Sequence, residues 1–151
     1  MKPLLALVLL GFSAISAVAQ SPANGAATPF SDVLLGESTK NLDEFVWIKR
    51  PLVVFADSPA DPRYVQQMAF ITERLSELEI RDVVVLTDTN PSERSALRQK
   101  LHPRGFMLVL IGKDGTIFLR KPLPWDVREI TRAIDKMPMR QQEIRDGKGA
   151  S

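Results

Sequence analysis

The sequence predicts a single-domain α/β protein with a mixed sheet, in the element order β-α-β-α-β-β-α. Two near-continuous apolar runs, from Pro51 to Asp57 and from Asp82 to Asp88, are bounded by turn residues. Runs of this kind are typical of strands buried on both faces of a sheet. Each is followed by a segment whose apolar residues have helical spacing. A third apolar run then leads through a short turn into a fourth, which indicates a β-hairpin.

The first 19 residues have the three parts of an export signal. Lys2 precedes an uncharged apolar run from Leu4 to Phe12, and small residues end in an A-x-A site at Ala17–Ala19. An uncleaved membrane anchor is the alternative, but the apolar core is short for the roughly 20 residues of a bilayer span. We expect residues 1–19 to be a signal peptide, and the protein to be periplasmic or secreted. No later run is long enough to cross a membrane, so no integral membrane segment is expected after cleavage.

The remaining 132 residues suit one domain with its own core. We expect residues 20–29 to be a flexible leader, residues 30–145 the domain and residues 146–151 a disordered tail. Without the signal the net charge is +1, which gives nucleic-acid binding little support. The chain is acidic up to Leu97 and basic from Arg98 onward. These halves either interleave and cancel or leave a basic face for a partner.

The elements follow in order from Phe30. The mixture of Leu and Phe with Asp and Glu from Phe30 to Ile48 predicts a short helix. After the strand from Pro51, an amphipathic helix is predicted by apolar residues at alternating steps of four and three. These residues are Tyr64, Met68, Ile71, Leu75 and Leu78.

The second half begins after the strand that ends at Asp88. Asn90, Pro91 and Glu93 suit the cap and first turn of a helix that carries Leu97 and Leu101. The hairpin strands are 106–112 and 116–120. Asp126 and Glu129 then begin a last helix, Pro138 ends it, and the polar segment after Met139 is expected to fray.

This order is the thioredoxin-like arrangement, but the chain has no cysteine. At the strand-to-helix junction where thioredoxins carry redox cysteines, it has Ser58, Pro59, Ala60 and Asp61. A serine hydroxyl cannot perform thiol exchange. Pro103 also lies a few residues too early for the proline that thioredoxins hold before the third strand. We therefore expect no enzyme activity, no catalytic residues and no cofactor.

Several phrases together carry a more specific resemblance: RPLVVFADSP, RDVVVLTDT, RGFMLVLIGKDG, LRKPLPW and DKMPMRQQEIR. They are similar to a domain of unknown function found in exported bacterial proteins and in vertebrate matrix proteins, including sushi-repeat-containing ones. The resemblance covers roughly Phe45 to Arg145. It implies a thioredoxin-like fold, an extracytoplasmic setting and contact with other proteins, and it brings no catalytic residues.

One candidate interaction edge gathers residues from several elements. Asp57 and Asp88 end two parallel strands, at the edge where α/β proteins usually bind ligands. We predict that this edge consists of Asp57, Ser58, Asp61, Asp88, His102 and Arg104. Its three carboxylates suggest an alternative function, a metal-dependent or carboxylate-based envelope enzyme. The other interpretation is that Asp61 caps a helix, while Asp57 pairs with Arg104 or Asp88 with Arg98.

A second candidate surface is the basic face of the final helix, formed by Arg128, Arg132, Lys136 and Arg140. The lone histidine, His102, has no partner for a zinc site, and we predict no metal site. We therefore interpret the chain as an exported, non-catalytic binding or protein-interaction module. Its expected partner is an unidentified envelope or extracellular protein.

Overall fold

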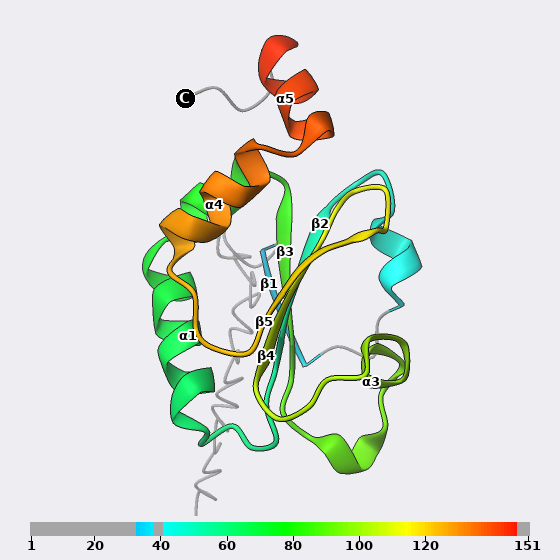
Figure 1. Ribbon diagram of the computed structural model, residues 1–151, viewed down its shortest axis with the longest axis vertical. Helices are drawn as coiled ribbons and strands as arrows, with labels where there is room; N and C mark the ends of the chain where they lie inside the picture. The colour runs from blue at the N-terminus through cyan, green and yellow to red at the C-terminus, as the bar shows by residue number, and fades with distance from the viewer. Residues whose placement is uncertain (1–32, 38–40, 148–151) are drawn as a thin grey trace, which may run out of the picture.

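The computed structural model describes residues 33–37 and 41–147. Its strands form one sheet and are β1 (Leu34–Glu37), β2 (Arg50–Phe55), β3 (Val83–Asp88), β4 (Met107–Ile111) and β5 (Ile117–Lys121). Their order across the sheet is β1-β3-β2-β4-β5 (Figure 1). The first three are parallel, while β4 runs antiparallel to β2 and β5 antiparallel to β4. The predicted mixed sheet is confirmed.

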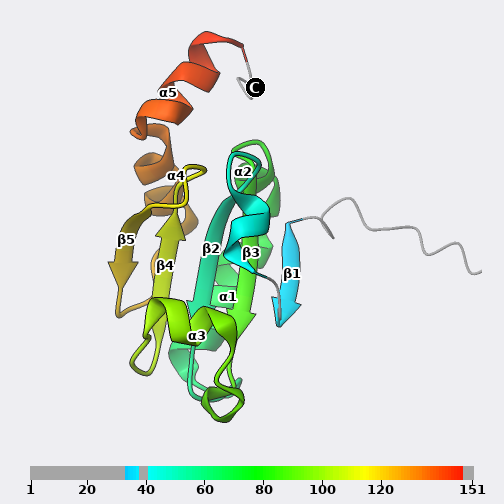
Figure 2. The same cartoon turned by 90° about the vertical axis from the view of Figure 1, so that its right-hand side faces the viewer.

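Helices cover the two faces of this sheet unequally. One face carries α1 (Pro62–Glu73), α2 (Leu75–Glu79) and α4 (Val127–Asp135). Among the described residues, the other carries short helices, chiefly the 3-10 helix η1 (Leu42–Phe45) and the six-residue α3 (Ala96–Leu101), as Figures 1 and 2 show. The second face is therefore thinly covered over part of the sheet.

Each face of the sheet has its own apolar core. Side chains alternate along β2, so that Leu52 packs toward Ile71 and the helices α1, α2 and α4. Val53 and Phe55 pack toward η1 and α3. All residues of β2 and β3 are buried, which confirms that both apolar runs are doubly covered strands.

The expected helix between Phe30 and Ile48 is wrong in part. Within the described residues this region forms the strand β1 and then η1, with Asn41 as its N-cap. β1 pairs in parallel with β3, so backbone hydrogen bonds to a distant strand decide its conformation. Residues 30–32 and 38–40 lie outside the described residues, as do the predicted signal peptide and leader.

Two predicted helices are broken in the structure. Arg74 leaves the helical region (φ −132°, ψ 37°) and separates α1 from α2. Asn90 does cap a helix, but this is the 3-10 helix η2 (Pro91–Glu93), which ends at Arg94 in a left-handed conformation. Ser95 then caps α3 by accepting a hydrogen bond from the Arg98 backbone N–H at 3.2 Å. A positive φ at Arg94 is a local feature that apolar spacing does not reveal.

The segment after Met139, which the sequence predicts to fray, belongs to a helix, α5 (Pro138–Arg145). It lies beyond the sheet at the end where β2 begins (Figure 1). Glu143 holds it there, because both Arg50 Nη2 and Lys113 Nζ contact its Oε1, at 2.9 and 2.8 Å. The side chain of Arg50 is only 1% exposed and that of Glu143 11%. Ion pairs thus attach a polar helix that has little apolar surface of its own.

The ion pairs of Glu143 extend along α5 to α4. Arg140 lies 3.3 Å from Glu143 Oε2 and 3.3 Å from Asp135 Oδ1, and Asp135 also pairs with Arg81 at 2.9 Å. Burial raises the pKa of Glu143, but hydrogen bonds from Arg50 and Lys113 outweigh burial and lower this pKa to about 2. Glu143 is therefore charged throughout the physiological range.

None of the helices in the described residues combines the length and the apolar character that a membrane crossing requires.

Candidate functional site

The loop after β2 contains the first part of the predicted edge. Asp57 and Ser58 are exposed, and Ser58 Oγ accepts a hydrogen bond from the Ala60 N–H at 3.1 Å. Asp61 is the N-cap of α1, and its Oδ1 accepts from the Arg63 N–H at 2.9 Å. The interpretation of Asp61 as a helix cap is confirmed. Ser58 is held in a local turn by its hydrogen bond with the Ala60 N–H.

Arg63, which sequence reasoning missed, pairs with one carboxylate of this loop, that of Asp61. Its Nη2 lies 2.9 Å from Asp61 Oδ2, and its guanidinium stacks 5.7 Å from the ring centre of Phe106. Hydrogen bonds from Arg63 lower the pKa of Asp61 below its usual value. Asp61 raises the pKa of Arg63, and the charge of Asp57 adds to this effect. The spacing from Asp61 to Arg63 is the signal that could have revealed the pair.

Asp88 belongs to the structural framework of the edge. Its Oδ1 lies 2.8 Å from Arg98 Nε, and the Ser95 hydroxyl donates to its Oδ2. Arg98 also donates to the carbonyl oxygen of Ala56 at 2.7 Å and stacks on Phe55. The predicted Asp88–Arg98 pair is confirmed. It joins the ends of β2 and β3 to α3, and the carboxylate is almost fully buried.

His102 and Arg104 complete the predicted edge as exposed residues. His102 ends α3 in a left-handed conformation (φ 48°), and its N–H donates to the Arg98 carbonyl oxygen. Within the described residues, Asp57 and Arg104 form no ion pair, so this alternative pairing is wrong. Asp57, Ser58, His102 and Arg104 are exposed, whereas Asp61 is partly buried and Asp88 is buried, and the role of the edge in binding a partner stays a prediction.

In residues 33–37 and 41–147, no three His, Asp or Glu side chains gather as metal ligands. Asp61 and Asp88 each hold a cationic partner and backbone or hydroxyl donors instead. These contacts explain both residues without the alternative enzyme.

We expect the N-cap at Asp61 to make a measurable contribution to the melting temperature. Asp61→Ala removes both the backbone cap and the pair with Arg63, and should lower the melting temperature by roughly 3 °C. Asp61→Asn keeps an oxygen that can accept from the Arg63 N–H and should lose less. Thermal unfolding followed by circular dichroism compares them. Equal melting temperatures for the two variants would contradict the role of Asp61 as a cap.

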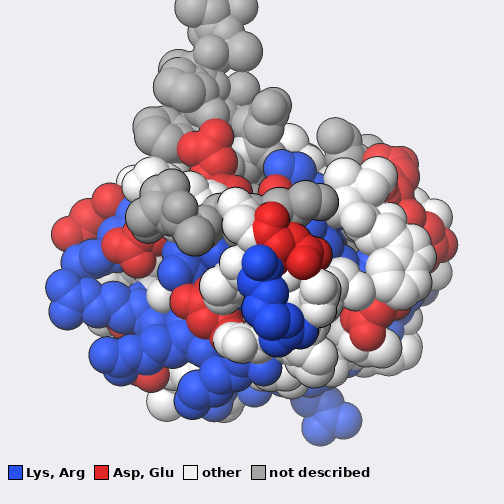
Figure 3. Space-filling view, turned by 90° about the horizontal axis from the view of Figure 1, so that it is seen from above, with Lys and Arg blue, Asp and Glu red and all other residues white. Residues whose placement is uncertain are grey.

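The basic face is only partly present. Arg128 and Arg132 on α4 and Lys136 at its C-cap are exposed, and Arg132 pairs with Glu129 at 3.0 Å. Seen from the end that carries α5, Lys and Arg side chains gather beside α4 with some carboxylates among them (Figure 3). Arg140 is not part of this face, since its side chain is buried against Asp135 and Glu143. The sequence suggested that Arg140 is exposed because it follows Lys136 by four residues, as on one face of a continuous helix. In the structure the helix is broken at Met137, so this spacing does not apply.

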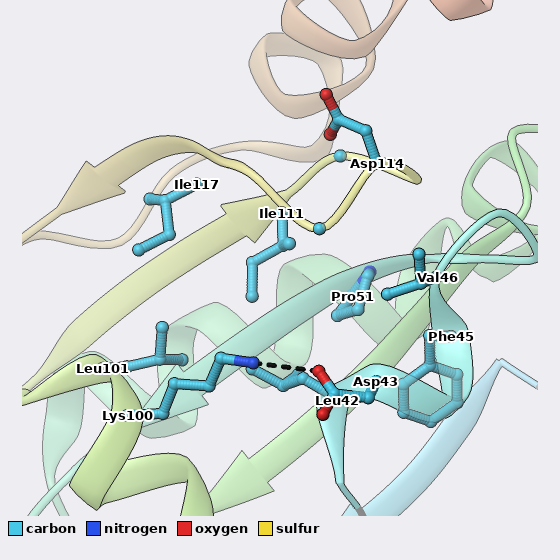
Figure 4. A pocket seen from close by; sticks show the side chains of 12 residues that line it. Leu42, Asp43, Phe45, Val46, Pro51, Lys100, Leu101, Ile111, Asp114 and Ile117 are labelled. Carbon is cyan, nitrogen blue, oxygen red and sulfur yellow. Dashed lines mark hydrogen bonds and ion pairs between the residues drawn. The ribbon is translucent and has the colours of Figure 1, made fainter.

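A cavity of about 380 Å³ lies on the thinly covered face of the sheet. It opens between η1, α3 and the β4–β5 hairpin (Figure 4). Apolar side chains form most of its wall: Leu42, Phe45, Val46, Pro51, Leu101, Ile111 and Ile117. The sequence offered no signal for this site. The cavity exists because the two short helices η1 and α3 leave part of the sheet uncovered.

Polar groups occur at only a few points of the cavity. Lys100 Nζ on α3 lies 3.1 Å from Asp43 Oδ1 on η1, and the two side chains face each other in Figure 4. The hydrogen bond from Lys100 lowers the pKa of Asp43. Both side chains are largely exposed, so this pair contributes little to stability and can open. Asp114, at the hairpin, accepts hydrogen bonds from Thr116.

Two solved structures illustrate what this chain is similar to. A reduced 2-Cys peroxiredoxin of Plasmodium vivax is 14% identical, with a TM-score of 0.57, over 68% of this chain and 85% of the other. A mitochondrial 2-Cys peroxiredoxin of Plasmodium falciparum is 16% identical, with a TM-score of 0.48, over 74% of this chain and 86% of the other. At such identity the first similarity supports the thioredoxin-like fold and nothing more.

A family model matches residues 41–143, which is more than half of the chain and includes both the Asp57 edge and the apolar cavity. The chain belongs to the family described as Domain of unknown function (DUF4174).

Proposed function

We propose that this protein is an exported, non-catalytic binding module whose binding site is the apolar cavity between η1, α3 and the β4–β5 hairpin. The observation that carries the proposal is the cavity itself. Ligand sites in proteins are typically concave, of about 300–1,000 Å³, and lined by apolar side chains with a few polar groups. The cavity has this size and this lining, with Lys100 and Asp43 as the polar pair.

A binding role is supported by the residues that lie where thioredoxins carry their redox cysteines. The chain has no cysteine, and the loop from Ser58 to Asp61 makes local turn and cap contacts. Such contacts stabilise the start of α1 and leave no activated nucleophile at Ser58. The cavity lies on the face of the sheet opposite α1. We infer that the fold serves as a frame for this second site.

Export is the other part of the proposal. It rests on Lys2, the apolar run from Leu4 to Phe12 and the A-x-A site that ends at Ala19. The partner would then be an envelope or extracellular molecule. Expression of the full gene tests this part, since the exported product should begin at Gln20 by mass spectrometry. A product that keeps Met1 and stays in the cytoplasm would overturn it.

Binding in the cavity can be tested with a small apolar probe. We expect indole to bind saturably and to shift the amide NMR signals of Leu42–Val46, Leu101 and Ile111–Ile117. Val46→Trp places a large ring at the wall of the cavity and should weaken indole binding at least tenfold. Val65→Trp, an equal change at an exposed position on α1, should leave binding unchanged.

The location of the shifts decides the outcome. Saturable shifts confined to the cavity residues, and lost in Val46→Trp alone, would support the proposal. Shifts spread over the whole surface, or the same affinity in both variants, would show that the cavity is not a binding site.

A further inference from the structure

The strand β5 is an outer strand of the sheet and lies beside the cavity. It pairs with β4 on one side and lies at the margin of the sheet in Figure 2. A strand in this place directs one row of backbone N–H and C=O groups away from its sheet. Another extended segment can pair with such a row. No strand of the described residues pairs with the outer side of β5.

Ile117 connects this strand to the cavity. It is the first residue of β5, it is 44% exposed, and its side chain forms part of the cavity wall (Figure 4). Residues opposite each other on paired strands have Cβ atoms about 4.5–5.5 Å apart. A residue opposite Ile117 on an added strand would thus lie close enough to place its side chain in the cavity.

An irregularity in the hairpin brings a cation to the same face. Ile117 is opposite Ile111, and Arg120 is opposite Val109, with a register shift between these pairs. Ile111 and Val109 both face the core beneath η1 and α3. Ile117 and Arg120 therefore share the face of β5 that contains the cavity. A regular strand would place residues three apart on opposite faces.

The charge of β5 indicates the chemistry of the added strand. Arg120 and Lys121 are its charged residues, and neither forms an ion pair within the described part of the chain. Arg120 donates to the Leu101 carbonyl oxygen, and Lys121 lies 4.5 Å from the ring centre of Trp125. Arginine has five N–H donors, so Arg120 keeps donors for a carboxylate. Two copies of β5 side by side would bring four cations together, which disfavours pairing with a second copy.

We propose that β5 binds an extended, acidic segment of a partner protein, which adds a sixth strand and places one apolar side chain in the cavity. Backbone hydrogen bonds along β5 would supply affinity, the cavity would select an apolar residue, and Arg120 would select a carboxylate on the same face. This inference rests on the proposed function, since it identifies the occupant of the same cavity.

Defined peptides test the inference. Two fluorescein-labelled peptides of eight residues each contain one Leu and two Glu among residues that favour β-strands. The Leu precedes the Glu residues in one peptide and follows them in the other, because the added strand could run in either direction. Matched peptides have Lys in place of Glu. Fluorescence anisotropy measures the dissociation constants, and amide NMR shifts locate the site.

We expect one acidic peptide to bind at β5 at least tenfold more tightly than its Lys counterpart. Arg120→Gln removes the charge but keeps a donor for the Leu101 carbonyl oxygen, and should weaken that binding at least fivefold. Arg145→Gln, the same change at an exposed position on α5, should leave it within twofold. Val46→Trp should weaken it as well, because it occupies the cavity.

Separate results identify which proposal fails. If indole binds in the cavity but acidic and basic peptides bind equally, or bind without shifts at β5, the strand proposal is overturned and the cavity remains a binding site. If neither indole nor any peptide binds, both proposals fail.

Discussion

Replacing Glu143 by alanine is expected to lower the free energy of unfolding by about 3 kcal/mol, because it leaves buried cations without their carboxylate. Among its contacts with described residues, the almost fully buried side chain of Arg50 would keep the hydrogen bond to the Arg81 carbonyl oxygen. Lys113 would keep Asp82 as its partner. We also expect α5 to detach from the domain. Urea unfolding measures the energy, and amide exchange along α5 shows the detachment.

Two further variants distinguish the loss of stability caused by breaking a buried ion pair from that caused by breaking an exposed one. Glu129→Ala breaks the exposed pair with Arg132 and should cost at most about 0.5 kcal/mol. A double variant, Arg50→Met with Glu143→Leu, replaces the buried pair by apolar side chains and should be more stable than Glu143→Ala. Equal losses for Glu129→Ala and Glu143→Ala would refute the explanation.

The contribution of Glu143 should depend on pH. Its pKa is about 2 in the folded protein and 4.5 as a reference for the unfolded chain. Because the folded pKa is the lower one, the stabilisation is complete above the unfolded pKa and is lost as the pH falls through the folded pKa. We expect the difference between wild type and Glu143→Ala to shrink by about 3 kcal/mol between pH 6 and pH 2. A difference that is constant over this range would contradict the assigned pKa.

Features fixed by neighbouring residues could be predicted from the sequence. β2 and β3 were evident as apolar runs, since a strand buried on both faces has no polar alternation. The cap at Asp61 and the pair between Asp88 and Arg98 also followed from short spacings. In each case the partner lies within one turn or one connection of the chain.

Features fixed by distant contacts could not be predicted. β1 is a strand because β3 offers it a partner, while its own four residues have no clear alternation. The polar pattern of α5 indicated fraying, and the helix is held by Glu143 and Arg50, which are 93 residues apart in sequence. The apolar cavity likewise depends on the short lengths of η1 and α3 as folded.

Replacing Asp88 by alanine is expected to cost about 3 kcal/mol in the free energy of unfolding. The side chains of Asp88 and Arg98 are only 8% and 10% exposed, so the change leaves an almost buried guanidinium without its counterion. Arg98 would keep its bonds to the carbonyl oxygens of Ala56 and Asp88. Urea unfolding at pH 7 measures the loss.

The exposed pair of Lys100 and Asp43 provides the matched control for Asp88. It also joins α3 to another element, but both of its side chains are largely in solvent, so Asp43→Ala should change stability little. If Asp88 were instead held free for a cation or a substrate, its removal would leave stability unchanged or raise it. A loss of about 3 kcal/mol in Asp88→Ala, with little change in Asp43→Ala, would therefore show that the carboxylate at the end of β3 is structural. In that case the edge at Asp57 keeps only its exposed residues for contact with a partner.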